Sequence, residues 1–247
     1  MEDPDSWSSD APDAADTRGV THFDEIAHEY DASIPAHVMD HYVSRRAALL
    51  SGLLTDETTA AVLEVGCGTG VLLDRMDSSD RSCFGLDPSA GMLAVAARDH
   101  REGARVAGSG EALPFTDGAF DLVYCVAVLH HVIEPEAVHR VIGEMVRVCR
   151  VGGHVVIWDH NPRNPYWPYL MRRVPQDHGD ERLVPEREIL DAIRDAGATV
   201  VASKQLGLVP DFAPRRLLRA AQVTEAAVER VPGLRRLCAH NVVIAQR

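Results

Sequence analysis

Apolar and polar positions follow two different periods along most of the chain. Short, mostly apolar runs of strand length occur at residues 61–65, 83–86, 105–107, 120–126, 154–158, 199–205 and 239–245. Stretches with helical spacing lie between most of them, at residues 71–76, 89–100, 135–149 and 185–197. Apolar strands that alternate with helices indicate a parallel sheet covered by helices on both faces. We therefore predict an α/β fold with a doubly wound sheet.

The N-terminal segment and two long connections depart from this alternation. Six acids stand against one arginine in residues 1–19, which predicts a disordered acidic tail. Helical periodicity follows over residues 23–54, so these helices must pack against later parts of a single domain that spans 20–247. Residues 161–185 and 207–238 are longer than a strand–helix connection requires, and segments of this kind often carry function.

Composition narrows the class of protein. With 46% hydrophobic and 25% charged residues, the 247-residue chain is typical of a water-soluble globular protein, and no apolar run has the length of a membrane span. The acidic N-terminus does not resemble a signal peptide, and five scattered cysteines without CxxC spacing favour a reducing compartment. A net charge of −12 argues against nucleic-acid binding. We expect a cytoplasmic protein with a small-molecule partner; surface patterning neither predicts nor excludes an oligomer.

A glycine-rich turn follows the first apolar run. Residues 62–70 read Val-Leu-Glu-Val-Gly-Cys-Gly-Thr-Gly, so a buried strand ends in a sharp turn at which a ligand can approach the backbone. Dinucleotide-binding turns place a third glycine where this chain has Val71. Glu64 would repel a pyrophosphate, whereas it suits a ligand with a positive ammonium group. The turn therefore favours a cofactor other than a nicotinamide dinucleotide.

Asp87 is the second candidate anchor for a cofactor. It ends the second predicted strand, 17 residues after Gly70, where an acid can accept hydrogen bonds from both hydroxyls of a ribose. Asp87 can also cap the helix that follows Pro88, and the two roles are compatible. The position thus indicates a nucleoside-containing ligand.

These motifs, with four further blocks, resemble the class I S-adenosylmethionine-dependent methyltransferases, specifically the small-molecule group that includes the ubiquinone and menaquinone C-methyltransferases. The resemblance covers about residues 20–160. The matching blocks are Leu63–Gly70, Gly85–Ser89, Glu111–Phe115, Phe120–Val123, Leu129–His131 and Arg150–Gly153.

The resemblance implies a fold and a cofactor. The fold is a seven-stranded Rossmann-like sheet with an antiparallel last strand, a helical lid at 20–55 and substrate-side caps at 161–185 and 207–238. The cofactor is S-adenosylmethionine, with S-adenosylhomocysteine as product, and no metal is implied. The residues expected to bind it are Glu64, Gly66, Cys67, Gly68, Gly70, Asp87, Pro88, Met92, Ser109, Gly110, Glu111 and Val126. Ser109 departs from the family, which often has an aspartate there that contacts the adenine.

Histidines stand where an acceptor would meet the cofactor. His130 and His131 follow the fourth predicted strand, and His160 follows Asp159 at the end of the fifth. Ligands of open α/β sheets lie over these strand ends, and histidine is suited to remove a proton near neutral pH. We therefore name His160, His131 and His130 as candidate catalytic bases, with Asp159 orienting His160. A structural role for them stays open, and an acceptor that is already nucleophilic needs no base.

Candidate acceptor-binding residues come from the lid and the first cap segment. They are Tyr30, His41, Tyr166 and Trp167, with His37, Tyr42 and Arg45 as further lid contacts. The aromatic residues can equally plug the cap onto the sheet. His37 and His41 have a chelating i, i+4 spacing, but no third ligand follows at a diagnostic interval, so no metal site is predicted. Paired arginines at 172–173, 215–216 and 235–236 could hold an acidic group or be solvated surface.

The predicted activity is transfer of a methyl group to a small molecule, with oxygen favoured as the acceptor atom because histidines line the expected site. The expected setting is secondary or quinone-type metabolism. Three alternatives stay open: a non-methylating enzyme on the same fold, such as a cyclase or decarboxylase, a non-catalytic protein that binds adenosyl ligands, and a nicotinamide-dependent oxidoreductase.

Overall fold

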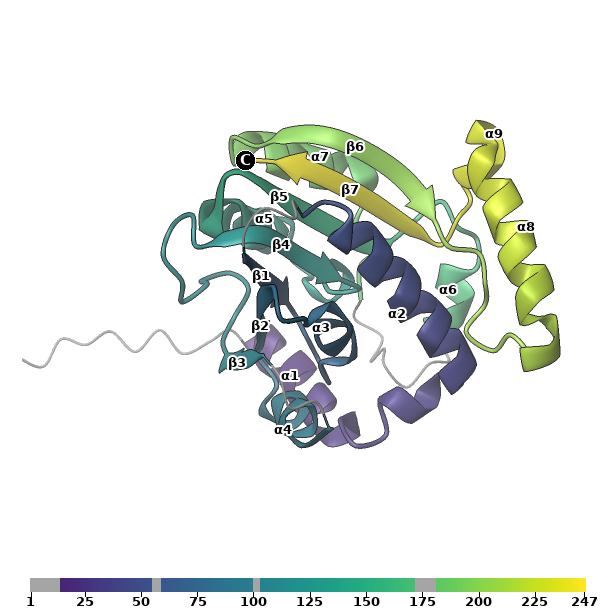
Figure 1. Ribbon diagram of the computed structural model, residues 1–247, viewed down its shortest axis with the longest axis horizontal. Helices are drawn as coiled ribbons and strands as arrows, with labels where there is room; N and C mark the ends of the chain where they lie inside the picture. Colours follow the sequence, from purple (N-terminus) through teal and green to yellow (C-terminus); the bar gives the residue numbers. More distant parts are fainter. Residues whose placement is uncertain (1–13, 55–58, 100–102, 172–180) are drawn as a thin grey trace, which may run out of the picture.

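A single seven-stranded sheet with helices on both faces forms the centre of the molecule (Figure 1). The computed structural model describes residues 14–54, 59–99, 103–171 and 181–247. The strand order is β3-β2-β1-β4-β5-β7-β6, and only β7 runs antiparallel to its neighbours. The strands are β1 Ala60–Val65, β2 Arg81–Asp87, β3 Ala104–Ala107, β4 Phe120–Val126, β5 Cys149–His160, β6 Thr199–Leu206 and β7 His240–Gln246. The predicted fold class, including the antiparallel last strand, is confirmed.

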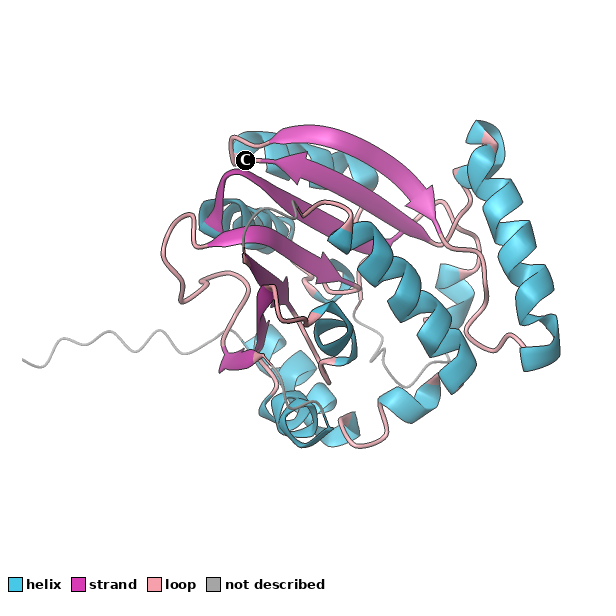
Figure 2. Cartoon of the chain, in the orientation of Figure 1, coloured by secondary structure: helices cyan, strands magenta, loops and turns pink. Residues whose placement is uncertain are grey.

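Helices fill the connections between strands, as Figure 2 shows in cyan. The described α-helices are α1 Ala14–Ile26, α2 Ala36–Ser51, α3 Val71–Met76, α4 Ala90–Asp99, α5 Pro135–Val148, α6 Trp167–Leu170, α7 Glu186–Asp195, α8 Leu218–Arg230 and α9 Pro232–Arg235. Three short 3-10 turns are η1 Asp31–Ser33, η2 Leu129–His131 and η3 Arg215–Leu217. Among the residues that the structure describes, no helix is long and apolar enough to cross a bilayer.

Two apolar layers hold the helices to the sheet. Alternate side chains of each strand point to opposite faces, so Val123 and Ile157 pack with α5 and α7, whereas Val62 and Val156 pack with α2 and α3. Both layers consist of side chains that are almost fully buried. The sheet is therefore covered on both faces, as its apolar strands predict.

The N-terminal helices correct one predicted boundary. Residues 14–19, placed in the disordered tail from their composition, begin α1; residues 1–13 lie outside the described part of the chain. Ala27 packs with Met92 and Val95 of α4, so α1 and α4 lie side by side at the lower edge of the view (Figure 1). Phe23 and Ile26 make the apolar contact with α4, so the contact comes from the part of α1 that the helical periodicity identifies.

The two long connections lie at the β5–β7 end of the sheet. The first contains α6, and its residues 172–180, which include the arginine pair 172–173, are outside the description. The second contains α8 and α9, which stand at the right edge of Figure 1, beyond α2. Val38 of α2 packs with Val209 and Ala213 of this second connection. Two segments far apart in the chain thus form one wall beside the sheet.

Candidate functional site

The glycine-rich turn joins β1 to α3 at the carboxyl edge of the sheet. Gly66, Gly68 and Gly70 all have positive φ angles, of 72°, 52° and 82°. A Cβ on Gly66 would lie 2.4 Å from a methyl carbon of Val128, so this glycine is required by packing as well as by conformation. The backbone N–H of Gly66 donates to Leu86 O at 2.7 Å, which ties the turn to the end of β2. The turn is thus rigidly placed beside the topological switch between β1 and β4.

Asp87 organises the backbone around this turn. Its Oδ2 accepts a hydrogen bond from Gly68 N at 2.8 Å, and its Oδ1 accepts one from Ser89 N at 2.9 Å. Ser89 caps α4, because its Oγ accepts a hydrogen bond from Met92 N at 3.1 Å. Burial raises the pKa of the Asp87 carboxyl, although the N–H donors of Ser89 and Gly68 act in the opposite direction. Both roles inferred for Asp87, capping and display of a carboxylate at the strand end, fit this geometry.

Glu64 stands buried at the end of β1, only 4% exposed. Tyr124 donates a hydrogen bond from its hydroxyl to Glu64 Oε2 at 3.2 Å. Burial raises the pKa of Glu64 to about 8, although Tyr124 and the charge of Arg46 act in the opposite direction. A cationic group brought next to this carboxyl would lower its pKa and ionise it. The position suits a ligand ammonium group, as the sequence predicts.

The remaining predicted cofactor residues differ in how they are placed. Met92 is buried in the contact between α1 and α4, and Pro88 is exposed. Ser109 Oγ accepts a hydrogen bond from Glu111 N at 3.2 Å. The Glu111 carboxylate turns outward and pairs with Arg140 of α5, with Oε2 2.7 Å from Arg140 Nε. Gly110, Cys67 and Val126 lie in the turn, strand-end or loop segments at the same edge.

Two acids of the N-terminal lid, which the sequence analysis did not identify, contact the segments around the glycine-rich turn and the start of α4. Asp31 Oδ1 accepts a hydrogen bond from Thr69 Oγ1 at 2.8 Å, so η1 lies against the glycine-rich turn. Asp24 Oδ1 accepts hydrogen bonds from Ser89 Oγ at 2.6 Å and Gly91 N at 2.7 Å at the start of α4. Asp24 lies one helical turn from an apolar position and faces the predicted N-cap of α4. An acid in such a position is the signal that could have identified it.

Asp159 orients a different histidine from the one predicted. Its Oδ1 lies 2.9 Å from His130 Nδ1 but 4.0 Å from His160 Nδ1, which is beyond hydrogen-bond distance. Asp159 also accepts N–H donors from Val128 and Leu129, at 3.1 and 2.6 Å. Burial alone would raise the pKa of Asp159, but His130 and these donors bring it below its usual value. The predicted Asp159–His160 pair is therefore wrong, because successive side chains of an extended strand point apart.

Aromatic rings form a continuous row across the ends of β4 and β5. His130 stacks on His160 with centroids 3.9 Å apart, and His160 stacks on Trp167 at 3.6 Å. His131 continues the row towards the lid, 4.0 Å from His130 and 5.0 Å from Phe23 of α1. Burial and the neighbouring histidines bring the pKa of His160 well below its usual value, so His160 is a neutral imidazole at physiological pH.

Three groups in this row lie close enough to share an ion. Donor atoms of His130, Asp159 and His160 are all within 4.8 Å of one another. A metal bound by an imidazole lies in the plane of the ring. The His130 and His160 rings are nearly parallel, with an angle of 16° and centroids 3.9 Å apart, so their planes do not converge on one point. The stacked arrangement therefore does not favour chelation.

A cavity of about 280 Å³ opens beside this row, between α2, the end of β5 and the second cap segment. Its walls are largely aromatic. They include Tyr42, Trp158, Tyr166, Trp167, Phe212 and His240. Of the predicted acceptor-binding residues, Tyr166 and Trp167 line this cavity, whereas Tyr30 packs near Phe23 and Met92 on the lid side. Trp158 was missed, since within an apolar strand it reads as core.

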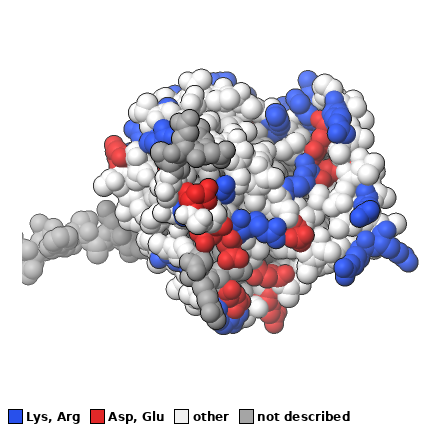
Figure 3. Space-filling model, in the orientation of Figure 1, with Lys and Arg blue, Asp and Glu red and all other residues white. Residues whose placement is uncertain are grey.

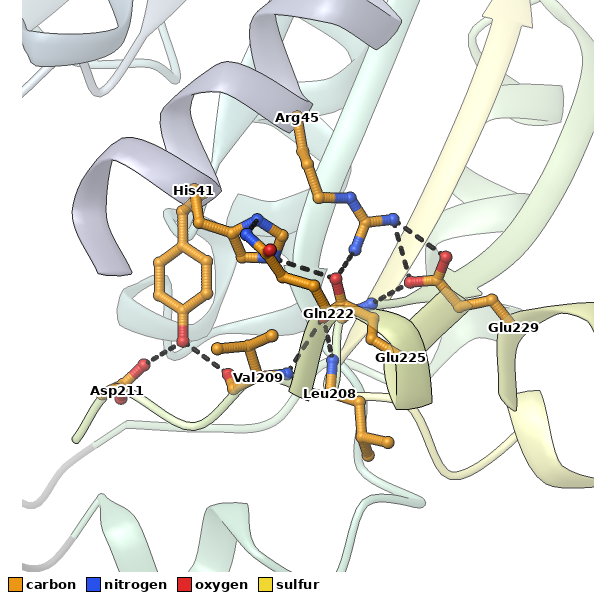
Figure 4. Close-up of polar contacts among 10 residues, drawn as sticks. His41, Arg45, Leu208, Val209, Asp211, Gln222, Glu225 and Glu229 are labelled. Atoms are coloured by element: carbon orange, nitrogen blue, oxygen red, sulfur yellow. Dashed lines mark hydrogen bonds and ion pairs between the residues drawn. The ribbon is translucent and has the colours of Figure 1, made fainter. Parts of the chain in front are cut away.

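Figure 4 shows why His41 and Arg45 are anchors of the wall instead of free contacts. His41 Nε2 lies 2.9 Å from Glu225 Oε1, and Arg45 bonds both Glu225 and Glu229. Glu225, only 2% exposed, also accepts the N–H groups of Leu208 and Val209 at 2.6 and 3.0 Å.

Glu225 was not predicted. Leu218, Ala221 and Glu225 have the spacing i, i+3, i+7 on α8, and an acid on this packing face is the signal that could have revealed it.

Tyr42 and His37 complete this anchoring. Tyr42 Oη lies 2.6 Å from Val209 O and 2.7 Å from Asp211 Oδ1, which are the two acceptors available to its one O–H proton. His37 Nε2 lies 2.7 Å from Ala213 O. The predicted lid residues thus fasten α2 to the second cap segment. Charged side chains seen in Figure 3 are interspersed, with basic groups along the α8 side and acidic groups over the centre and lower part of this face. The paired arginines 215–216 are exposed.

Comparisons with known proteins agree with this geometry. A family model described as a methyltransferase domain matches residues 63–157. A demethylmenaquinone methyltransferase of Mycolicibacterium paratuberculosis is 33% identical over 162 residues, which are 62% of this chain and 67% of that protein.

Two solved structures share the fold. One is an S-adenosylmethionine-dependent methyltransferase from Thermotoga maritima, with a TM-score of 0.63 and 19% identity over 92% of this chain and 99% of that one. The other is the [4+2]-cyclase SpnF, with a TM-score of 0.58 and 19% identity over 82% of this chain and 80% of that one.

The turn formed by Gly66, Gly68 and Gly70, the carboxylates of Glu64 and Asp87 at adjacent strand ends, and a relative matched over two thirds of its length lead to one conclusion. The chain belongs to the class I S-adenosylmethionine-dependent methyltransferases.

Proposed function

We propose that this enzyme methylates an oxygen atom of a small, planar molecule that enters the aromatic cavity. The hydrogen-bonded pair of Asp159 and His130, 2.9 Å apart at the carboxyl ends of β4 and β5, is the observation that carries this proposal. It provides an imidazole whose orientation is fixed by a carboxylate, an arrangement used for general-base catalysis. The name of the demethylmenaquinone methyltransferase relative adds support for a ring-shaped, quinone-type acceptor.

The cofactor would be held at the glycine-rich edge. Asp87 would accept the ribose hydroxyls, Glu64 would face the ammonium group, and the backbone of residues 66–70 would lie against the amino-acid moiety. When bound, S-adenosylmethionine supplies an electrophilic methyl group on a sulfonium. Because the reaction is a displacement in line with the departing sulfur, holding the two reactants in position accounts for much of the rate.

His130 is a better candidate base than His160, the residue ranked first from the sequence. An ionised Asp159 beside His130 stabilises the protonated imidazole that proton removal would create. His160 has no such carboxylate partner at hydrogen-bond distance, and burial disfavours its protonation. In this arrangement Asp159 holds the His130 ring and His130 takes the acceptor proton. Trp167 lines the cavity and His160 stacks between Trp167 and His130, so the acceptor would have to extend from the cavity past this stack to reach His130.

The test compares methyl transfer by the wild type and two histidine variants. The enzyme is incubated with S-adenosylmethionine and a panel of phenols and naphthols, and products are identified by mass spectrometry and NMR. We expect methyl ethers formed in equal amount with S-adenosylhomocysteine, and a loss of about 100-fold or more in kcat for His130→Gln with unchanged affinity for S-adenosylhomocysteine. The matched variant His160→Gln should retain turnover within a few-fold. Carbon-methylated products, or a His130→Gln enzyme that turns over normally, would overturn the oxygen-methylation proposal.

A non-methylating reaction on this fold is the second candidate, because the [4+2]-cyclase SpnF shares the architecture. The same assay separates the two. An acceptor converted without consumption of S-adenosylmethionine would indicate cyclase-like or decarboxylase-like chemistry, and binding without any conversion would indicate a binding protein.

A further inference from the structure

Arg46 is a cation in the wall of the aromatic cavity that has no counterion among the residues that the structure describes. It lies one helical turn after Tyr42 on α2, so both side chains face the cavity. Its guanidinium carbon lies 5.5 Å from the centre of the Tyr42 ring and 5.8 Å from that of Trp158. Within the part of the chain that the structure describes, Arg46 makes no hydrogen bond and no ion pair.

The other arginine of the cavity shows what a neutralised cation looks like here. Arg45, the preceding residue, bonds Glu225 and also Glu229, with Nη2 2.9 Å from both oxygens of Glu229. Buried acids and arginines of this wall are thus satisfied by one another. Arg46 is left out of that network, although it is half-buried and an unpaired buried charge is costly.

Two acids influence Arg46 electrostatically, but neither reaches ion-pair distance among the described contacts. Asp211 accepts the Tyr42 hydroxyl at 2.7 Å. Glu64, with a pKa of about 8, is largely protonated at neutral pH when no ligand is bound. Burial lowers the pKa of Arg46, partly offset by Tyr42 and these acids, yet a guanidinium stays charged in proteins. The cavity therefore presents an uncompensated positive charge.

We propose that Arg46 binds the acidic group of the methyl acceptor, so that the acceptor is a planar aromatic acid. The planar guanidinium can form two parallel hydrogen bonds to a carboxylate. Tyr42, Trp158 and Trp167 offer flat apolar surfaces to a ring system. A cavity of about 280 Å³ exceeds the roughly 150 Å³ that accommodates benzene and so has room for one or two fused rings. This inference rests on the proposed function, because it defines the substrate class of the same site.

The carboxylate that meets Arg46 could belong to the acceptor or to the amino-acid part of the cofactor. The aromatic surroundings favour the acceptor, since the cofactor's amino-acid moiety has no ring to stack there. Arg46 also interacts electrostatically with Glu64, the residue proposed to face the cofactor, so the cofactor carboxylate is the alternative ligand. The experiment therefore measures both ligands on the same variants.

The test titrates the full chain calorimetrically with 2-naphthoate, the uncharged isostere 2-naphthamide, S-adenosylhomocysteine and 5′-methylthioadenosine, which lacks the amino-acid moiety. Wild-type protein should bind 2-naphthoate about tenfold or more tightly than 2-naphthamide. Arg46→Gln should lose this preference while its affinity for S-adenosylhomocysteine stays within about threefold. Arg46→Lys, which keeps the charge, should retain part of the preference and guards against a misfolded glutamine variant.

Arg75→Gln is the matched control, since Arg75 is paired with Asp40 and does not line the cavity; it should keep the preference for 2-naphthoate. Equal binding of the two naphthyl probes by wild-type protein would overturn the inference. So would an Arg46→Gln protein that weakens S-adenosylhomocysteine but not 5′-methylthioadenosine, because Arg46 would then serve the cofactor carboxylate. Wild-type protein that binds neither adenosyl ligand would instead contradict the proposed function.

Discussion

Two regions of the molecule are built in different ways. We call the region around the glycine-rich turn, where we place the cofactor, the cofactor edge, and the side chains around the cavity, where we place the acceptor, the acceptor wall. At the cofactor edge, residues 64–92 contain the glycine-rich turn, both strand-end carboxylates and the N-cap of α4, and Asp87 bonds backbone groups only 2 and 19 residues away. In the acceptor wall, contacts such as Tyr42 with Val209 and His41 with Glu225 join positions 167 and 184 residues apart.

The difference lies in what holds each site together. The cofactor edge is made largely of backbone, so its requirements appear as glycines and acids at fixed spacing. The acceptor wall is a network of side chains around the buried Glu225, so its parts are spread over two distant segments. Variants should therefore separate the two: changes at Asp87 act on the cofactor, and changes at Glu225 or Tyr42 act on the wall.

The largest expected effect is on stability, from Glu225→Ala. The substitution leaves His41 and the N–H groups of Leu208 and Val209 without their acceptor, and it removes one of the two carboxylates that bind Arg45. It should lower the free energy of unfolding by about 3–5 kcal/mol. Urea denaturation measures the loss, and Glu229→Ala is the matched control with a smaller effect, because Glu229 is more exposed. A Glu225→Ala loss below about 1 kcal/mol would show that the network does not hold the wall.

Asp87→Ala should weaken binding of S-adenosylhomocysteine by about 100-fold, because the ribose hydroxyls lose their acceptor and the turn loses its tie to Gly68 N. Calorimetric titration measures this. Asp121→Ala is the control: its carboxylate accepts Ala61 N at 2.7 Å at the start of β1, at the opposite edge of the sheet. Equal losses in both variants would point to general destabilisation.

Glu64 predicts that cofactor binding depends on pH. With a pKa of about 8, the carboxyl is mostly protonated at pH 7 and must lose its proton to pair with an ammonium group. Binding therefore releases a proton, and affinity should rise with pH by up to about tenfold per unit until pH 8. Titrations of S-adenosylhomocysteine at several pH values, in buffers of different ionisation enthalpy, test the sign. Glu64→Gln should remove the Glu64 share of the release, and proton uptake by wild-type protein would contradict it.

The smallest effect is expected from Tyr42→Phe. Loss of the hydroxyl that bridges Val209 O and Asp211 Oδ1 should cost about 1 kcal/mol of stability and weaken 2-naphthoate binding a few-fold, with S-adenosylhomocysteine unaffected. Thermal unfolding and calorimetry measure the two changes. Tyr166→Phe provides the comparison, since the Tyr166 hydroxyl has no hydrogen bond to a described residue. A larger loss in Tyr166→Phe would reverse the assignment.

The same contrast explains what could be predicted from the sequence. Strand–helix alternation predicts the sheet, because strands that are buried on both faces consist of continuous apolar residues. The bounds of Val71–Met76 and Phe120–Val126 are predicted to the residue. Glu64 and Asp87 lie at the strand ends that the sequence predicts, and their role in binding the cofactor stays a prediction.

The remainder depends on contacts between distant segments. Asp159 lies at the predicted position, but only the fold shows that its partner is His130. In the sequence, Arg46 cannot be told from other arginines on helices. The fold shows that Glu225 of α8 pairs with Arg45 and that Arg46 has no ion pair among the described residues. The contact of α1 with α4 likewise joins segments that are distant in the chain, Ala14–Ile26 and Ala90–Asp99.

We propose that the two regions are separate sites for two ligands that bind together. The most direct measurement saturates the protein with S-adenosylhomocysteine and then titrates 2-naphthoate, with NAD as a third ligand. We predict one adenosyl ligand and one naphthoate per chain, each with nearly the same affinity whether or not the other is bound, and no binding of NAD. Displacement of naphthoate by S-adenosylhomocysteine, or binding of NAD in its place, would contradict the account.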